Sequence, residues 1–367
     1  MDASKKFDLI VRNLQEVMDE KQLKEILEQR DLSLYWGTAT TGRIHIGYLI
    51  PFAKLADYLE AGCEVKILLA DLHAFLDSQK TPWELLEARV KYYETIVKET
   101  LKALKVDVSK LKFVKGTDYQ LSREYCLDVY RLASITTVNE GIKAGAEVVK
   151  QSENPRLAPV LYPLLQALDE EYLKVDCQFG GTDQRKIFVL AHEFLPKMNY
   201  KKRIHLMNPM LPGLQGTKMS SSDASSKIDL LDSPDAIKKK LNNAFCPEGV
   251  IEENGVLLFI KYALFPYLER TNQNFKVERP EKFGGNIEFG SYDELENVFL
   301  EKKLHPMDLK QSLAKYLTQI LEPVRKAFED PKYSANLEKA YSNEKWFCEV
   351  IRWFIQIIKI NIKKKHY

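Results

Sequence analysis

The first two hundred residues alternate between short apolar runs and longer stretches with helical spacing. Four short runs fit strands, at residues 32–36, 65–70, 111–114 and 174–179, and the apolar run 65–70 fits a buried strand. Apolar residues recur with helical spacing at residues 7–29, 47–59, from Pro82 onward, 122–133, 157–173 and 183–194. Strands that alternate with helices in this way predict an α/β fold, with a parallel sheet covered by helices on both faces.

The strand pattern fades after about residue 233. Helical spacing then dominates, at residues 234–243, 253–268, 291–302 and 307–328. We therefore predict an α/β domain over residues 1–230 and a mainly α-helical domain over residues 231–340. Residues 341–367 form a distinct tail that is densely apolar and then basic. A docking helix, a segment lying on a membrane surface and a misassigned stretch of sequence all remain open for this tail; we slightly favour docking.

Composition narrows the class of protein. Lys and Arg total 54 against 52 Asp and Glu, so the net charge of +2 lacks the strongly basic footprint of many nucleic-acid-binding domains. Any contact with RNA must therefore use local clusters of basic residues. Five scattered cysteines without a C-x-x-C pair argue against a zinc site or a disulfide framework, and they fit a cytosolic protein. No apolar run reaches the roughly 18 residues of a membrane span, and no signal-peptide core is present.

A glycine-containing loop follows the first predicted strand. It reads Thr40-Thr-Gly-Arg-Ile-His-Ile-Gly-Tyr48 and leads into a helix. Ligands bind at the carboxyl ends of strands in such sheets, and a helix N-terminus there suits phosphate. Gly42 and Gly47 leave room for a nucleotide, and His45 can donate to a phosphate oxygen. Taken alone, the loop is more typical of a turn with a structural histidine.

A second loop offers a complementary set of groups. Pro212-Gly-Leu-Gln-Gly-Thr-Lys-Met-Ser-Ser-Ser222 combines glycines with one lysine and three hydroxyls. Such a segment can close over pyrophosphate. By composition alone a solvated linker is the better interpretation, and only the pairing with the first loop reverses that preference.

The two loops resemble the HIGH and KMSKS motifs of class I aminoacyl-tRNA synthetases. The chain is similar to the tyrosyl-tRNA synthetases of the archaeal and eukaryotic cytosolic type over roughly residues 6–330, including Asp71-Leu-His73 and Gly180-Gly-Thr-Asp-Gln-Arg-Lys186. The resemblance implies a Rossmann-type catalytic domain with an acceptor-stem-binding insertion at about 115–160, and a helical anticodon-binding domain. Two positions depart from the motifs: Tyr48 replaces a histidine and Ser222 a lysine.

Polar residues on one predicted helix face form a candidate tyrosine pocket. Tyr162, Gln166 and Asp169 are spaced to share a face, and between leucines they would need partners. An ordinary solvent-facing stripe is the alternative. The resemblance implies that Tyr35 and Asp169 bind the phenol, and that Tyr162, Gln166 and Gln184 accept from the ammonium group.

The resemblance also implies the chemistry. Tyrosine attacks ATP to give tyrosyl-adenylate and pyrophosphate, and tyrosine then passes to tRNA(Tyr). The phosphate-binding candidates in the two loops are Thr40, Gly42, His45, Gly47, Lys218, Met219, Ser220, Ser221 and Ser222. Positioning and charge stabilisation replace a protein nucleophile. Mg²⁺ should arrive with ATP, since we find no carboxylate cage for a metal. The family is dimeric, and apolar helix faces around 122–150 could supply the interface.

By the same resemblance, two groups of residues contact tRNA. Lys143, Arg185 and Lys186 match family residues that contact the first base pair of the acceptor stem. Without the resemblance, these three residues are more typical of ordinary surface cations. The residues that match the family's anticodon readers are Phe283, His305, Pro306 and Asp308. Phe283 can stack on a base and Asp308 can accept from a guanine edge; His305-Pro306 also fits a helix start, and both roles can hold together.

Three other functions compete with this interpretation. A tryptophanyl-tRNA synthetase shares the fold and the reaction, but Tyr35 and Asp169 favour tyrosine. A small nucleotidyltransferase could use the same first loop without needing a helical second domain. A non-catalytic RNA-binding relic is disfavoured because His45 and Lys218 are intact. Amino-acid-dependent ATP–pyrophosphate exchange separates the three.

Overall fold

A six-stranded sheet forms the centre of the N-terminal part of the chain. The computed structural model describes residues 1–77, 80–149, 156–210, 212–214 and 227–341. The strands lie in the order β1-β6-β5-β2-β3-β4. Their bounds are Glu16–Met18 (β1), Ser33–Ala39 (β2), Glu64–Ala70 (β3), Leu111–Lys115 (β4), Cys177–Gly181 (β5) and Ile204–Asn208 (β6). All neighbours are parallel except β1, which pairs antiparallel with β6 at one edge.

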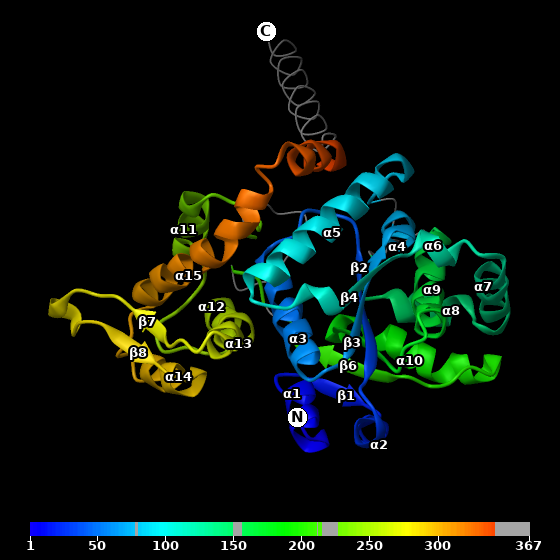
Figure 1. The fold of residues 1–367 in the computed structure, drawn as a ribbon, viewed down its shortest axis with the longest axis horizontal. Coiled ribbons are helices and arrows are strands. Elements are labelled where there is room, and N and C mark those ends of the chain that lie inside the picture. Colours follow the sequence, from blue (N-terminus) through cyan, green and yellow to red (C-terminus); the bar gives the residue numbers. More distant parts are fainter. Residues whose placement is uncertain (78–79, 150–155, 211, 215–226, 342–367) are drawn as a thin grey trace, which may run out of the picture.

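Alternating residues of the central strand β2 face two different layers. Leu34 and Trp36 join the large core, which includes side chains of helices α3 (Leu49–Glu60) and α5 (Leu86–Ala103). Tyr35 between them belongs to a separate cluster on the opposite face. Helix α9 (Ala158–Tyr172) covers that face, because the Tyr35 hydroxyl reaches the Gln166 carbonyl oxygen at 3.4 Å. The predicted Rossmann-type α/β architecture is confirmed (Figure 1).

The prediction of one helix over residues 7–29 is wrong. The segment forms helix α1 (Ala3–Val11), strand β1 and helix α2 (Glu20–Gln29). Asn13 and Asp19 adopt left-handed backbone conformations, with φ of 61° and 64°, and these interrupt a continuous helix. The Gln15 amide donates to the Met207 carbonyl oxygen at 2.8 Å, which extends the sheet instead. Strand pairing thus overrides the helical spacing of the apolar residues.

The remaining helices of the N-terminal part surround the sheet. They are α4 (Asp71–Leu76), α6 (Thr117–Gln120), α7 (Arg123–Ile135), α8 (Val138–Gly145) and α10 (Arg185–Phe194). Short 3₁₀ turns cover Ile46–Tyr48, Trp83–Leu85, Val108–Lys110, Thr182–Gln184 and Leu195–Met198. Helices α7, α8, α9 and α10 share a second apolar core of their own. Gly141 allows α8 and α9 to approach closely, since a Cβ atom there would lie 2.7 Å from Val160 Cγ1.

The C-terminal part is mainly helical but also contains a small sheet that the sequence did not predict. Its elements are α11 (Pro234–Asn242), α12 (Gly255–Phe259), a π-turn (Ile260–Leu264), α13 (Phe265–Arg270), β7 (Phe275–Val277), a 3₁₀ turn (Glu281–Phe283), β8 (Ile287–Phe289), α14 (Tyr292–Leu300) and α15 (Pro306–Ala327). Strands β7 and β8 pair antiparallel. Each has three residues, too few to give a clear alternating pattern.

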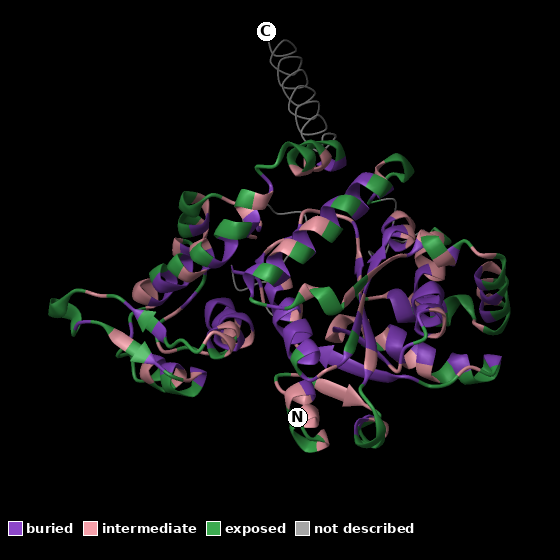
Figure 2. Ribbon diagram, in the orientation of Figure 1, coloured by how far each residue is buried: buried purple, intermediate pink, exposed green. Residues whose placement is uncertain are grey.

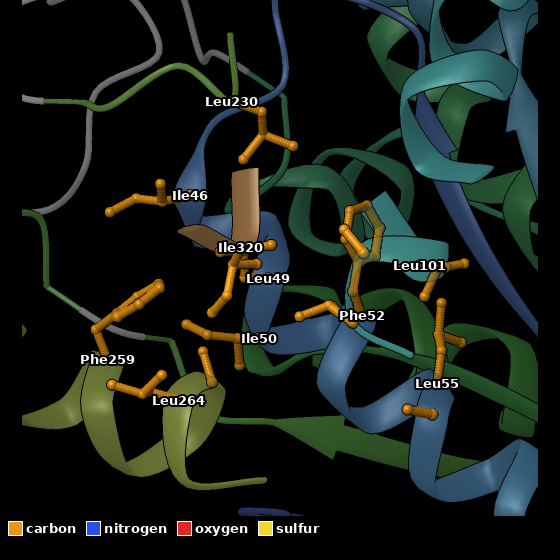
Figure 3. Close-up of a cluster of buried hydrophobic side chains, with 14 of the residues drawn as sticks. Ile46, Leu49, Ile50, Phe52, Leu55, Leu101, Leu230, Phe259, Leu264 and Ile320 are labelled. Atoms are coloured by element: carbon orange, nitrogen blue, oxygen red, sulfur yellow. The ribbon is translucent and has the colours of Figure 1, made fainter. Parts of the chain in front are cut away.

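The two parts pack through one continuous apolar core. Figure 3 shows Leu49 and Ile50 of α3 close to Phe259, Leu264 and Ile320 of the C-terminal helices. The buried colour in Figure 2 runs from the sheet through α3 into the C-terminal helices. Among the described residues, no helix is both long and apolar enough to cross a membrane.

An ion-pair cluster adds a polar joint beside this core. Asp57 of α3 is nearly fully buried and accepts from Arg12 at 2.6 and 2.9 Å. The Arg270 guanidinium of α13 donates to the same carboxylate at 3.1 Å, and Lys54 lies 3.3 Å from it. Arg12 also binds Glu269 at 2.9 Å. Asp57 therefore ties the N-terminal helix, α3 and the C-terminal part together.

Candidate active site

Candidate residues follow the carboxyl ends of three parallel strands, β2, β3 and β5. Chain order runs outward from β2 through β3 to β4, and then returns to β5 and β6 on the other side of β2. The gap between β2 and β5 is therefore the point where strand order reverses, which is where ligands bind in such sheets. The first loop follows β2, α4 follows β3, and Gly180-Gly181 ends β5. The described loops thus meet at one edge.

His45 lies at the start of the helical segment that follows the first loop. Its Nδ1 accepts from the Gly47 amide at 3.2 Å, which places the proton of a neutral imidazole on Nε2. Burial lowers the His45 pKa to about 4, with a smaller contribution from the charge of Lys227. His45 is therefore neutral at pH 7 and can act as a hydrogen-bond donor through Nε2. Tyr48 packs edge-on against its ring at 5.2 Å.

Hydrogen bonds from other elements hold the backbone of the first loop. The Gly42 carbonyl oxygen accepts from the Tyr93 hydroxyl at 2.7 Å and from the Tyr341 hydroxyl at 3.0 Å. The Thr40 carbonyl oxygen accepts from the Thr81 hydroxyl at 2.8 Å. Among the described residues, no atom beyond Gly42 and its chain neighbours lies within 4 Å of a Cβ built on Gly42. The loop is thus held by hydrogen bonds on one side, while its Gly42 Cα packs against no other described residue.

The polar residues predicted on one helical face do lie on α9. Tyr162, Gln166 and Asp169 are all buried. The Gln166 amide donates to Gln184 Oε1 at 3.1 Å, which joins α9 to the turn after β5. The His73 ring packs edge-on against Tyr162 at 4.6 Å. The structure therefore brings Tyr162, Gln166 and Gln184 into one neighbourhood.

The Asp169 carboxylate is fully enclosed, with 0% of the residue's surface exposed. Its Oδ1 accepts from the Tyr119 hydroxyl at 2.7 Å, Gln120 Nε2 at 2.8 Å and the Tyr125 hydroxyl at 2.9 Å. Burial nevertheless outweighs these bonds and raises the Asp169 pKa to about 7. Near neutral pH the carboxylate therefore exchanges readily between its protonated and ionised forms.

The second oxygen of this carboxylate lacks a donor. Asp169 Oδ2 makes no hydrogen bond to any residue that the structure describes, and His73 Nε2 is 3.8 Å away. Tyr35 is 1% exposed and lies near enough for the charge of Asp169 to raise its pKa, although burial is the larger cause. Its hydroxyl hydrogen is directed at the Gln166 carbonyl oxygen, at a long 3.4 Å. A buried acceptor thus lies within electrostatic range of a weakly bonded hydroxyl.

Sequence reasoning missed four residues around this carboxylate. Tyr119 and Gln120 come from α6, Tyr125 from α7 and His73 from α4. His73 lies in the Asp71-Leu-His73 segment that follows β3, and its place at a strand's carboxyl end was a usable signal. The other three come from α6 and α7, and no spacing along the chain relates them to α9.

The three predicted acceptor-stem cations differ in their contacts. Arg185 pairs with Glu16 at 2.8 Å, and Lys186 pairs with Glu147 at 2.8 Å. Lys143 on α8 is exposed and lies four residues before Glu147, which follows the end of α8. Lys143 and the Glu147 partner of Lys186 thus come from one short segment. The ion pairs would have to open for Arg185 or Lys186 to meet a phosphate or base.

The four predicted anticodon residues lie at two neighbouring places in the C-terminal part. Phe283 is 59% exposed, in the turn between β7 and β8. His305 caps α15 through Nδ1, which accepts from the Met307 amide at 3.1 Å, and Pro306 and Asp308 occupy the first turn. Arg279 bonds both Gly285 and Lys303 through their carbonyl oxygens, at 2.7 and 3.0 Å, and so links the two places. The predicted helix start is thus present beside an exposed aromatic ring.

Most of the second predicted loop lies outside the described residues. Lys218, Met219, Ser220, Ser221 and Ser222 lie outside the described residues, as does nearly all of the 341–367 tail. The chain rejoins the described part at Lys227, directly beside the first loop. There the Ile46 amide donates to the Ile228 carbonyl oxygen at 2.9 Å, and Arg43 pairs with Asp229 at 2.8 Å.

Comparison with known proteins assigns the family. Residues 27–322 match the family model described as tRNA synthetases class I (W and Y). The chain belongs to this family. Relatives and solved structures narrow the assignment to its tyrosine branch. A Saccharomyces cerevisiae protein named tyrosine–tRNA ligase, cytoplasmic, is 53% identical over 349 residues, which covers 93% of this chain and 89% of that protein.

Two further matches extend the comparison. A Danio rerio protein of the same name is 58% identical over 341 residues, and this chain spans 64% of its length. The structure of a tyrosyl-tRNA synthetase from Archaeoglobus fulgidus in complex with L-tyrosine superposes with a TM-score of 0.82 at 42% identity, covering 89% of this chain and 99% of the other. The chain thus spans about two thirds of some relatives and nearly all of others.

Proposed function

We propose that this protein is a tyrosine–tRNA ligase that acts in the cytoplasm. It would activate L-tyrosine with ATP to tyrosyl-adenylate and pyrophosphate, and then transfer tyrosine to the 3′ end of tRNA(Tyr). Membership of the tyrosine branch supports this assignment, as do relatives named cytoplasmic tyrosine–tRNA ligases. The observation that carries the proposal furthest is the buried Asp169 Oδ2, which has no donor among the described residues.

A tyrosine phenol suits this oxygen. Its hydroxyl would donate to Asp169 Oδ2 and accept from the Tyr35 hydroxyl, which would exchange its long bond to Gln166 for a shorter one. Phenylalanine would leave Asp169 Oδ2 without a donor, at a cost of about 1–3 kcal/mol, and would leave Tyr35 with only its long bond to Gln166. Tryptophan carries only an N–H donor, so it could not accept from Tyr35. The pair Tyr35 and Asp169 therefore favours tyrosine over both.

At the other end of the substrate, Tyr162, Gln166 and Gln184 would accept from the ammonium group. This orients the carboxylate toward the first loop, where it attacks the α-phosphate of ATP. His45 Nε2 would donate to a phosphate oxygen as negative charge develops, and the neutral state of His45 leaves that proton in place. Thr40, Gly42 and Gly47 would border the nucleotide, and Lys218 and Ser220 to Ser222 would contact its phosphates.

Mg²⁺ would accompany ATP in this scheme. Within the described residues, no group of three or more His, Cys, Asp or Glu side chains could hold a metal ion. The described residues therefore offer no cage of their own, and the ion would be held by the phosphates of ATP.

The tRNA would lie along one side of the molecule. Lys143, Arg185 and Lys186 would contact the acceptor stem near the strand ends, and Phe283, His305, Pro306 and Asp308 would read the anticodon. Phe283 is exposed and so can stack on an unpaired base. This division assigns residues 1–230 to catalysis, with the 115–160 segment facing the acceptor stem, and residues 231–340 to the anticodon.

A second copy of this chain would complete the assembly. Large apolar side chains on and around α7 and α8 are exposed: Leu121 54%, Leu127 56%, Tyr130 73%, Ile135 42% and Val138 61%. Several exposed apolar groups on adjoining elements are typical of an interface. We therefore assign this face to a homodimer, which sedimentation of the protein and of a Tyr130→Glu variant would test.

The decisive experiment for the activity is amino-acid-dependent ATP–pyrophosphate exchange, followed by charging of tRNA. Tyrosine should support exchange and tryptophan should not, and only tRNA(Tyr) should be charged. Exchange with tryptophan alone would move the protein to the other branch of the family. If no amino acid supports exchange, a synthetase function is contradicted.

A further inference from the structure

A row of polar side chains crosses the sheet beneath the proposed tyrosine pocket. Tyr35 of β2 pairs with Gln178 of β5, and Gln178 pairs with His205 of β6. Residues paired in register share one face of a sheet, so all three point toward α9 and α10. Gln178 and His205 are 3% and 0% exposed. The phenol-binding candidate Tyr35 is thus the first member of a buried polar row.

His205 ends this row in a pair with Glu170 of α9. His205 Nε2 lies 2.7 Å from Glu170 Oε1, and their side chains are 0% and 1% exposed. The Phe188 ring of α10 stacks on the imidazole at 4.6 Å and 17°. Glu170 Oε2, His205 Nδ1 and Gln178 Oε1 have no hydrogen-bond partner in the described part of the chain. Such a pair anchors α9 to β6, which is its minimal structural role.

Its position gives the pair a second role. Glu170 directly follows Asp169, and the charge of Glu170 adds to burial in raising the pKa values of both Asp169 and Tyr35. The phenol of a bound tyrosine donates a stronger hydrogen bond to the ionised form of Asp169 than to the protonated form. An uncompensated Glu170 carboxylate would therefore oppose tyrosine binding. His205, whose Nε2 lies 2.7 Å from Glu170 Oε1, is placed to offset that charge.

We propose that Glu170 and His205 are a positioning pair for the tyrosine pocket, in which His205 neutralises Glu170 and so keeps Asp169 available as the acceptor of the phenol. This inference rests on the proposed tyrosine–tRNA ligase function. Neither residue would touch the substrate. Both act through Asp169, by charge and by fixing the helix that carries it.

Other titratable groups face this region from every neighbouring element. Asp169 is met by Tyr119 of α6, Tyr125 of α7 and His73 of α4. Burial raises the pKa of the Cys177 thiol in β5, and the nearby charge of Glu170 raises it further. The ring of His192 in α10 is 6.4 Å from that of His205, and its Nε2 lies 2.7 Å from Asp19 Oδ2. The variants below leave all of these unchanged.

The test compares two substitutions that change the charge near Asp169 in opposite directions. Glu170→Gln removes a negative charge and should move the acidic limb of kcat/KM for tyrosine, in ATP–pyrophosphate exchange, to lower pH. His205→Gln removes the compensating positive charge and should move it to higher pH. We expect shifts of about one pH unit, the size typical of one nearby charge in a buried site.

A matched control uses the next residue of the same helix. Glu171 points elsewhere and pairs with Arg203 at 2.7 Å. Glu171→Gln should leave the limb in place. Equal losses of activity in the two test variants without a shift, or shifts in the same direction, would overturn the proposal, because a purely structural pair predicts those results.

Two further measurements keep the test decisive. The ¹⁵N signals of the His205 ring, identified by their loss in His205→Gln, should show a doubly protonated imidazole at pH 7; a neutral ring would contradict the proposal. Thermal unfolding identifies any variant that does not fold, and the remaining variant still decides the direction of the shift. If the wild-type protein fails to catalyse tyrosine-dependent exchange, the proposed function is wrong. If it catalyses exchange but the acidic limb does not shift in the variants, only the positioning role of Glu170 and His205 is refuted.

Discussion

Replacing Asp169 with asparagine should stabilise the free protein while it damages tyrosine recognition. Burial raises the Asp169 pKa from 3.8 to about 7, so the folded state favours the protonated carboxyl. For an acid whose pKa is raised on folding, the stability is complete below the unfolded pKa and is lost as the pH rises through the folded one. A shift of about 3 units corresponds to about 4 kcal/mol at pH values above 7.

Asparagine avoids this cost because it has nearly the same shape and no charge. Its oxygen can accept from Tyr119, Gln120 and Tyr125 as Asp169 Oδ1 does. Linkage then gives the variant an advantage of about 2 kcal/mol near pH 5 and about 4 kcal/mol near pH 8. Urea unfolding of the ligand-free proteins, followed by far-UV circular dichroism at both pH values, measures this difference.

The opposite sign is expected at a matched control. Arg30 and the Ser33 amide hold the Asp176 pKa below its usual value, against the effect of burial. Asp176→Asn should therefore destabilise the protein near pH 8. An Asp169→Asn variant that is less stable than wild type near pH 8, or whose advantage does not grow between pH 5 and pH 8, would refute the assignment of a strained buried carboxyl.

Three further substitutions probe other parts of the account. Tyr35→Phe removes one neutral hydrogen bond to the phenol and should lower kcat/KM for tyrosine in the exchange assay about tenfold, while activity with phenylalanine stays unchanged; equal losses with both amino acids would contradict a phenol contact. Phe283→Ala changes an exposed ring, so exchange and thermal stability should be unaffected while kcat/KM for tRNA(Tyr) falls about tenfold or more, as loss of one base stack predicts; unchanged charging would remove Phe283 from the anticodon site. Asp57→Ala leaves Arg12, Lys54 and Arg270 without their shared buried carboxylate and should cost about 3–5 kcal/mol in urea unfolding; a cost below about 1 kcal/mol would show that the cluster does not join the two parts.

Periodicity predicted the elements of the sheet where apolar runs were long and clearly bounded. Residues 65–70 and 111–114 were expected as strands and lie in β3 and β4. The pattern failed where tertiary pairing decides. Strand β6, residues 204–208, was not predicted, although all five of its residues are buried. β1 was absorbed into a predicted helix because its apolar residues continue the helical spacing of their neighbours.

The candidate pocket shows the same division. The spacing of Tyr162, Gln166 and Asp169 was sufficient to place them on one buried face. The sequence could not supply the neighbours of Asp169, since Tyr119 and Tyr125 come from helices 44 to 50 residues away along the chain. Nor could it show that one oxygen is saturated with donors while the other has none. That asymmetry depends on how α6, α7 and α9 pack.

The pocket also illustrates why a site can lower stability. The free protein holds a carboxylate at a cost that burial imposes, and a bound phenol would supply the missing donor to Oδ2. Part of the binding free energy of tyrosine would then come from relief of this unfavourable state. Phenylalanine has no hydroxyl and could not supply this donor. The unfavourable state of Asp169 in the free protein would therefore favour tyrosine over phenylalanine.

The most direct test of phenol recognition by Tyr35 and Asp169 is the ratio of kcat/KM for tyrosine to that for phenylalanine, measured by ATP–pyrophosphate exchange in the wild-type protein and in Asp169→Asn. Tyrosyl-tRNA synthetases are themselves the source of the figure of about 10⁵ for this ratio, which we adopt as precedent. We predict a ratio of that order for the wild-type protein and a fall of about tenfold or more in the variant, caused by slower use of tyrosine alone. A wild-type ratio of about 100 or less, or a variant that keeps the wild-type ratio, would contradict the account.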